Sequence, residues 1–83
     1  MALIDSFRKQ TLDCSGQLCP IPIIMTEEKM AAMKNGQVLE VIFTDPGAHP
    51  DLEVWCLATG NRLLEVKKLK TSGRAYIRKE EGV

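Results

Sequence analysis

The sequence predicts a two-layer α+β sandwich in which two helices cover one face of a four-stranded mixed sheet. Strand-like and helix-like segments follow one another in the order β-α-β-α-β-β, with turn residues between them. The chain has 83 residues, enough for one modest core and too few for two. The initial β-α-β order predicts a right-handed parallel crossover between the first two strands.

The first strand is expected over residues 10–14, where polar and apolar side chains alternate. A turn follows it, in which Gly16 supplies a backbone geometry that other residues resist. Residues 1–9 show no clear period and are expected to form a flexible N-terminal arm. With a short tail over residues 81–83, the single domain is expected to cover residues 10–80.

Cys19 stands where this strand leads into a helix expected over residues 20–34. The residue before a proline is extended, and Pro20 suits the first helical position, so Cys19 is the predicted N-cap. Pro22 removes another early donor and leaves the N–H of Ile21 to face the sulfur. Because helix N-termini lower thiol pKa values, the pattern predicts a reactive cysteine. The same spacing also allows a buried, inert cysteine beside an ordinary helix-start signal.

Two apolar stripes compete on this helix, and both cannot face one core. The stripe that runs the full length of the helix is the predicted core face. The other stripe is left as apolar surface beside Cys19, which predicts a docking site for a partner protein. The alternatives are a rotated helix, or an Ile24 covered by the N-terminal arm. The predicted core stripe is Ile23, Thr26, Met30 and Met33, and the predicted docking residues are Ile21, Ile24 and Met25.

Asn35 and Gly36 are expected to end the helix, because both residue types tolerate left-handed geometry. Residues 37–44 follow as a strand that is apolar on both alternations, as expected at the centre of a sheet. One face of this strand carries Leu39, Val41 and Phe43, and the other carries Val38, Glu40 and Ile42.

A turn-rich connector over residues 45–50 leads to a second helix that is expected to stop at Gly60. Residues 61–70 and 74–79 are expected to form a terminal hairpin around a turn over residues 71–73. Lysines and arginines at its outer positions protect the sheet edge from pairing with another chain. The predicted inner face of the second helix is Leu52, Trp55, Cys56 and Thr59.

Composition excludes several classes of function. Eleven basic and eleven acidic residues cancel, so no overall field attracts the chain to nucleic acid or an anionic membrane, although the count leaves a local basic patch open. The N-terminus lacks a signal-peptide pattern and no apolar stretch reaches membrane-spanning length, so a cytoplasmic protein is expected. Three cysteines fit free thiols in a reducing compartment. His49 is the only histidine, expected in a surface loop, so no metal site and no cofactor are predicted.

The segment Leu12-Asp13-x-x-Gly16-x-x-Cys19-Pro20-x-Pro22 resembles the signature of the TusA (SirA-like) sulfur-carrier family. The resemblance extends over roughly residues 10–80. It implies a strand order of 1-2-4-3 with an antiparallel last pair. The later landmarks are Gly36, the Thr44-Asp45-Pro46 turn, Asp51, Trp55-Cys56, Gly60, Leu63-Leu64 and the closing Tyr76-Ile77-Arg78-Lys79.

The resemblance also implies a function, which is to hold sulfane sulfur as a persulfide on Cys19. A cysteine desulfurase or rhodanese-like donor would load the sulfur, and a DsrE-like protein would accept it, in tRNA thiolation, cofactor sulfuration or sulfur oxidation. Such a chain is a persulfide carrier rather than a stand-alone enzyme, and its helix-start N–H groups are expected to stabilise the persulfide anion. The expected supporting residues are Pro20, Ile21, Pro22, Gly16 and Asp13.

Two other functions remain open at this point. The family pattern does not require a cysteine at position 14, and Cys14 is either an inert strand residue or a resolving thiol that forms a disulfide with Cys19. In the second case the protein is a thiol-disulfide redox switch. The third possibility is a non-catalytic binding module, since similar two-layer folds bind RNA, but the zero net charge argues against it.

Overall fold

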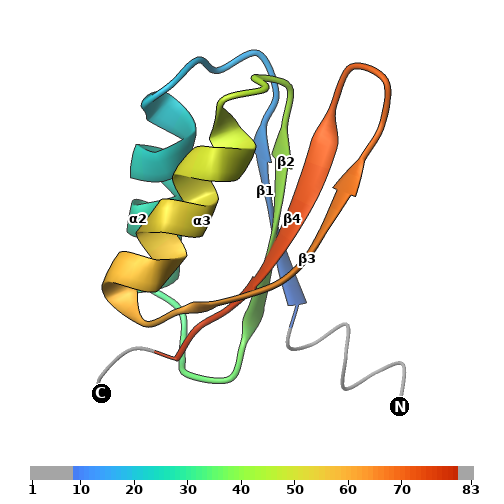
Figure 1. The fold of residues 1–83 in the computed structure, drawn as a ribbon. Coiled ribbons are helices and arrows are strands. Elements are labelled where there is room, and N and C mark those ends of the chain that lie inside the picture. The colour runs from blue at the N-terminus through green and yellow to red at the C-terminus, as the bar shows by residue number, and fades with distance from the viewer. Residues whose placement is uncertain (1–8, 81–83) are drawn as a thin grey trace.

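The computed structural model describes residues 9–80 and confirms the predicted sandwich (Figure 1). The sheet order is β1-β2-β4-β3, with β1 parallel to β2 and the other two pairs antiparallel. Both helices lie on the same face of the sheet (Figure 1). Within the described residues, no helix is both long and apolar enough to cross a membrane. The elements are β1 (Lys9–Cys14), α2 (Ile21–Ala31), β2 (Val38–Phe43), α3 (Ala48–Thr59), β3 (Arg62–Lys68) and β4 (Gly73–Arg78).

The ends of the domain differ slightly from the prediction. Lys9, assigned to the N-terminal arm by the sequence, is the first residue of β1 and pairs with Val38. The rest of that arm and the predicted tail lie outside the described residues. In the hairpin, β3 is shorter than the predicted range, and β4 is shifted by one residue toward the N-terminus. Gly73 therefore belongs to β4 rather than to the turn. A Cβ on Gly73 would lie 2.5 Å from the Phe43 ring, so only glycine fits there.

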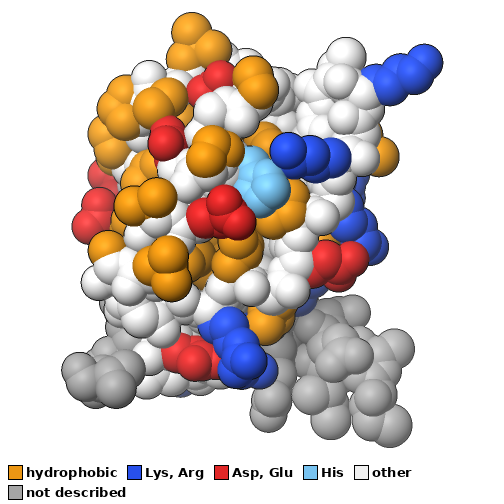
Figure 2. Space-filling view, viewed as in Figure 1, with side chains coloured by type: hydrophobic (Ala, Val, Ile, Leu, Met, Phe, Trp, Pro, Cys, Tyr) orange, Lys and Arg blue, Asp and Glu red, His pale blue; other side chains and the backbone are white. Residues whose placement is uncertain are grey.

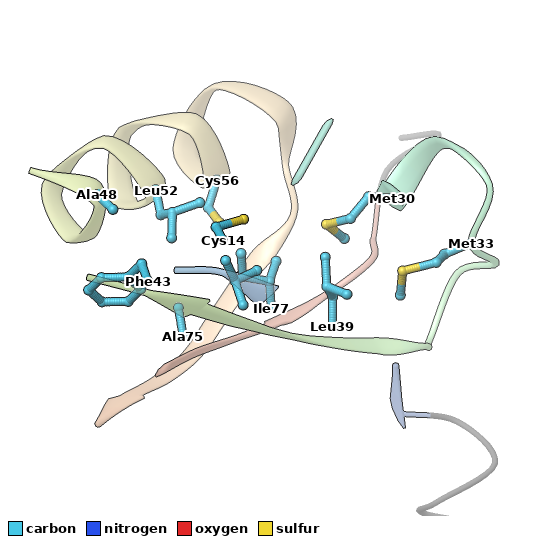
Figure 3. Close-up of a cluster of buried hydrophobic side chains, with 11 residues drawn as sticks. Cys14, Met30, Met33, Leu39, Phe43, Ala48, Leu52, Cys56, Ala75 and Ile77 are labelled. Atoms are coloured by element: carbon cyan, nitrogen blue, oxygen red, sulfur yellow. The ribbon is translucent and has the colours of Figure 1, made fainter. Parts of the chain in front are cut away.

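The core lies between the helices and the covered face of the sheet, where the side chains of both layers point toward one another (Figure 3). The predicted core stripe faces it, because Thr26 and Met30 on α2 are buried and Ile23 packs against the cluster. The helix ends at Ala31, earlier than the predicted end at Asn35 and Gly36, so the buried Met33 lies in the turn after α2. The inner alternation of β2 is also confirmed. The buried apolar residues are Cys14, Met30, Met33, Leu39, Val41, Phe43, Ala48, Leu52, Cys56, Ala75 and Ile77.

Strands β1 and β2 end level with each other, because Cys14 is the register partner of Phe43. The loops that follow them, residues 15–20 and 44–47, therefore leave the sheet at the same edge (Figure 1). In open sheets with parallel strands, functional sites usually lie at this carboxyl end of the strands.

The second helix begins earlier than predicted, at Ala48. His49 and Pro50 lie in its first turn and not in a surface loop, so that part of the prediction is wrong. Proline is tolerated there because the first N–H groups of a helix have no intrahelical partner. The predicted end at Gly60 is confirmed, with the left-handed φ of 85° that glycine adopts readily.

The other face of the sheet carries a buried carboxylate. Glu40, on the central strand β2, has only 5% of its surface exposed. Its carboxylate accepts hydrogen bonds from Tyr76 Oη at 2.8 Å, Thr11 Oγ1 at 3.1 Å and Arg74 Nη1 at 3.2 Å. This network joins β1, β2 and β4 on the face that the helices leave uncovered.

Candidate functional site

Cys19 lies in the exposed loop between β1 and α2. A hydrogen bond and a left-handed glycine shape the start of this loop: Asp13 Oδ1 accepts the Ser15 N–H at 2.9 Å, and Gly16 has a φ of 80°. The Gly16 N–H then donates to Thr44 Oγ1 at 2.8 Å, across to the loop that follows β2. Asp13 and Gly16 thus contribute to the shape of the loop, and neither forms a hydrogen bond with Cys19.

Two carboxylates contact Cys19 directly. The Cys19 thiol donates a hydrogen bond to Asp51 Oδ2, with 2.8 Å between sulfur and oxygen. The Cys19 N–H donates to Asp45 Oδ2 at 3.0 Å, and Asp45 Oδ1 also accepts the Gly47 N–H at 3.3 Å. Asp51 is in the first turn of α3.

The predicted N-cap was wrong. Pro20 occupies that position, without a side-chain capping bond, and the Cys19–Pro20 peptide bond is cis. The Ile21 N–H, expected to face the sulfur, donates to Leu18 O at 2.8 Å. The next two non-proline N–H groups both donate to Pro20 O, at 3.1 and 3.2 Å. The early donors of α2 therefore have backbone partners, and the prediction that they stabilise a sulfur anion is not met by this arrangement.

The pKa of the Cys19 thiol is shifted in the direction opposite to the prediction. The hydrogen bond to Asp51, partial desolvation, and the negative charges of Asp51 and Asp45 together raise it above the ordinary value. The N-terminus of α2 acts the other way, but a carboxylate in contact with the sulfur outweighs a screened helix dipole. This shift favours the protonated thiol over the thiolate.

The remaining cysteines are enclosed. Cys14 and Cys56 are 0% and 3% exposed, in the same core cluster, and all three cysteines are free thiols. Burial raises the pKa of Cys56 to about 11. Burial, aided by the charge of Asp13, also raises the pKa of Cys14. Cys19 is the one thiol of the three that a partner can reach without opening the core.

The predicted docking residues divide into two groups. Ile21 and Ile24 are 39% and 44% exposed, whereas Met25 is half-buried and packs against the core cluster. Leu18, which the sequence analysis did not single out, is 70% exposed next to Cys19. Figure 2 shows hydrophobic side chains spread over the helical side, while lysines and arginines gather toward the hairpin side.

The two prolines also differ. Pro20 is exposed, but Pro22 is buried beneath the first turn of α2. Pro22 therefore contributes to the packing of α2 against the rest of the domain. Pro20 lies on the exposed surface next to Cys19.

Asp45 and Asp51 are the residues whose roles were missed, since the sequence marked them only as family landmarks. Their contacts with Cys19 span 26 and 32 positions of the chain. The available signal was topological, because the carboxyl ends of two parallel strands meet at one edge of a sheet. Among residues 9–80, no group of three or more histidine, cysteine, aspartate or glutamate side chains could hold a metal ion.

Comparison with known proteins places this site in a family context. A family model described as Sulfurtransferase TusA matches residues 10–79. The sulfur carrier protein TusA of Allochromatium vinosum is 48% identical over 59 residues, which cover 71% of this chain and 78% of that protein. The protein of the same name from Pseudomonas entomophila is 32% identical over 78 residues, which cover 94% of this chain and 98% of that protein.

One relative is much longer. A candidate sulfur carrier protein of Aquifex aeolicus is 50% identical over 70 residues, which cover 84% of this chain and 36% of that protein. The chain thus spans about a third of the length of that relative. Among solved structures, the SirA-like protein of Desulfitobacterium hafniense has a TM-score of 0.66 at 24% identity, over 87% of this chain and 99% of that chain. That likeness shows a shared fold.

Proposed function

The chain belongs to the TusA (SirA-like) sulfur carrier family, and from this premise we propose that it holds sulfane sulfur as a persulfide on Cys19. One observation carries the proposal: Cys19 is the only exposed thiol of the three, and it lies within the segment that the family model matches. A carrier needs a thiol that two proteins can reach in turn, and the loop between β1 and α2 offers one.

We further propose that the sulfur comes from a cysteine desulfurase or rhodanese-like donor and goes to a DsrE-like acceptor. The relay would serve tRNA thiolation, cofactor sulfuration or sulfur oxidation. Three free thiols fit a reducing compartment such as the cytoplasm. The chain acts as a carrier between enzymes, since the sulfur it receives and the sulfur it gives away are the same atom.

The proposed docking surface surrounds Cys19. Ile21 and Ile24 on α2 are exposed, and Leu18, directly before Cys19 in the chain, is exposed as well. Met25 contributes less, because it packs against the core. Apolar side chains grouped beside a reactive atom favour a partner that covers the site during transfer.

Mass spectrometry after incubation with a sulfane donor tests the proposal. We expect the wild-type chain to gain one sulfur atom, Cys19→Ser to gain none, and Cys56→Ser to behave as wild type, because Cys56 is enclosed in the core. An adduct that persists in Cys19→Ser would show that the site is assigned to the wrong residue.

The redox switch is less well supported. Cys14 has no exposed surface, so a disulfide with Cys19 would require β1 to release a core residue. The same mass measurement separates the two functions, because a disulfide appears as the loss of two hydrogen atoms. The binding module predicts no change of mass.

A further inference from the structure

The sulfur of Cys19 has an unusual setting for an atom that would hold a negative charge. Asp51 Oδ2 lies 2.8 Å from Sγ, and Asp45 Oδ2 lies 3.0 Å from the Cys19 nitrogen. Within the described part of the chain, neither carboxylate takes part in an ion pair. The early N–H groups of α2, which could have offset this charge, are bonded to backbone carbonyls.

We propose that Asp51 disfavours the sulfur-loaded form of Cys19 and thereby makes this protein a sulfur donor rather than a sulfur store. The inference rests on the proposed persulfide function. It concerns the position of the exchange equilibrium, which the carboxylate shifts toward the unloaded thiol.

The two forms of Cys19 interact differently with Asp51. The unloaded thiol donates its proton to Oδ2 and keeps a hydrogen bond with a charged acceptor. A persulfide is a stronger acid than the parent thiol, so its outer sulfur tends to ionise and then faces a carboxylate of the same sign. The outer sulfur is one bond beyond Sγ, so its charge lies near the Asp51 carboxylate and is repelled by it, and the alternative of keeping the persulfide protonated also costs free energy. Whether the persulfide ionises or stays protonated, Asp51 raises the free energy of the loaded state relative to that of the unloaded thiol.

The transfer step balances without an added oxidant or reductant. The Cys19 proton passes to Asp51, and the thiolate attacks the outer sulfur of the donor persulfide. A new S–S bond forms on Cys19, while the donor S–S bond breaks and its electron pair stays on the donor's inner sulfur. That thiolate takes up the proton, so thiol plus persulfide gives persulfide plus thiol. Delivery to the acceptor is the same reaction with Cys19 as the donor.

The test is an equilibrium measurement on the full chain. Each protein is equilibrated with glutathione persulfide and glutathione at a fixed ratio, and mass spectrometry gives the fraction of Cys19 that carries the extra sulfur. The proteins compared are the wild type, Asp51→Asn, Asp51→Glu and Glu53→Gln. Glu53 is the matched control, since it is an exposed carboxylate on the same helix that contacts His49 and not Cys19. Thermal melts verify that each variant is folded.

We expect Asp51→Asn to raise the ratio of loaded to unloaded protein by about fivefold, the factor for one nearby unit charge in a largely aqueous setting. Asp51→Glu and Glu53→Gln should stay near wild type. If wild type loads and Asp51→Asn has the same ratio, the inference is overturned and the persulfide function stands. If wild type does not load at Cys19, the proposed function itself is wrong.

A second measurement does not depend on sulfur transfer. The rate of Cys19 alkylation by iodoacetamide, followed against pH, reports the ionisation of the thiol. Because Asp51 raises the pKa of Cys19, Asp51→Asn should move this profile to lower pH. An unchanged profile would show that Asp51 does not control charge at the sulfur and would also overturn the inference.

Discussion

Asp45 holds the backbone of Cys19 in place, through a hydrogen bond of 3.0 Å from the cysteine N–H to Oδ2. The other oxygen of the same carboxylate accepts the Gly47 N–H, so Asp45 is itself held by the loop that begins α3. The loop that carries the thiol is thereby attached to the neighbouring loop rather than to its own helix.

Asp45→Ala should therefore loosen the thiol loop and leave the core intact. We expect the Cys19 amide to exchange with solvent several-fold faster, because its acceptor is lost, while amides of β2 exchange as before. Hydrogen exchange followed by NMR measures both. Equal acceleration across β2 would mean that Asp45 supports the whole sheet.

The two prolines should have separable effects. Pro22 is buried, and Pro22→Ala removes buried carbon atoms, so it should lower the free energy of unfolding by about 1 to 2 kcal/mol. Pro20 is exposed, so Pro20→Ala removes little buried carbon, and we expect this variant to slow sulfur transfer. Denaturant unfolding and a transfer assay on both variants make the comparison. A Pro20→Ala variant with unchanged transfer would remove its proposed role in presenting Cys19.

Much of this fold follows from the sequence because each element has a local signal. The spacing of Thr26 and Met30 indicated the buried side of α2, and Gly60 marked the end of α3. The contacts of the site were harder to predict. Asp51 reaches Cys19 only through the parallel pairing of β1 and β2, and no local pattern encodes that approach.

The pKa of Cys19 was mispredicted for the same reason. A helix N-terminus is a local feature and visible in the sequence, whereas the carboxylate that outweighs it comes from another element. The N-cap prediction failed because Cys19, Pro20 and Pro22 fit more than one turn, and the turn that forms uses Leu18 O as the acceptor.

Glu40 should make stability depend on acid pH. Burial opposes its ionisation, but hydrogen bonds from Tyr76, Thr11 and Arg74 outweigh burial and lower the pKa of its carboxyl. A carboxyl with a lowered folded-state pKa stabilises the fold above its unfolded pKa of about 4.3, and this contribution is lost as pH falls through the folded value. Below about pH 4 the wild type should therefore lose stability faster than Glu40→Gln, whose side chain does not titrate.

Thermal melts between pH 3 and pH 7 test this effect. At pH 7 we expect Glu40→Gln to be less stable by about 1 to 3 kcal/mol, because the hydrogen bonds to a charged acceptor are weakened. Parallel stability curves for the two proteins across this range would contradict the role of Glu40. Glu53→Gln, on the exposed side of α3, serves as the control carboxylate.

The docking surface can be separated from the core on a single helix. Ile24 is 44% exposed and Met30 is 1% exposed, although both are large apolar residues of α2. Met30→Ala should cost about 2 to 5 kcal/mol of stability, as expected for a buried side chain of this size. Ile24→Ala should cost less and instead weaken binding of the acceptor by more than about 1 kcal/mol.

Calorimetric unfolding and titration with the acceptor measure the two quantities for each variant. Ile21→Ala should behave like Ile24→Ala, since it is 39% exposed on the same surface, whereas Met25→Ala should show part of each effect because it packs against the core. If Ile24→Ala destabilises the domain as much as Met30→Ala and binds the acceptor normally, the apolar surface beside Cys19 is not a docking site. The stripe on α2 would then serve packing alone, and the partner would have to recognise Cys19 through the loops that carry Asp45 and Asp51.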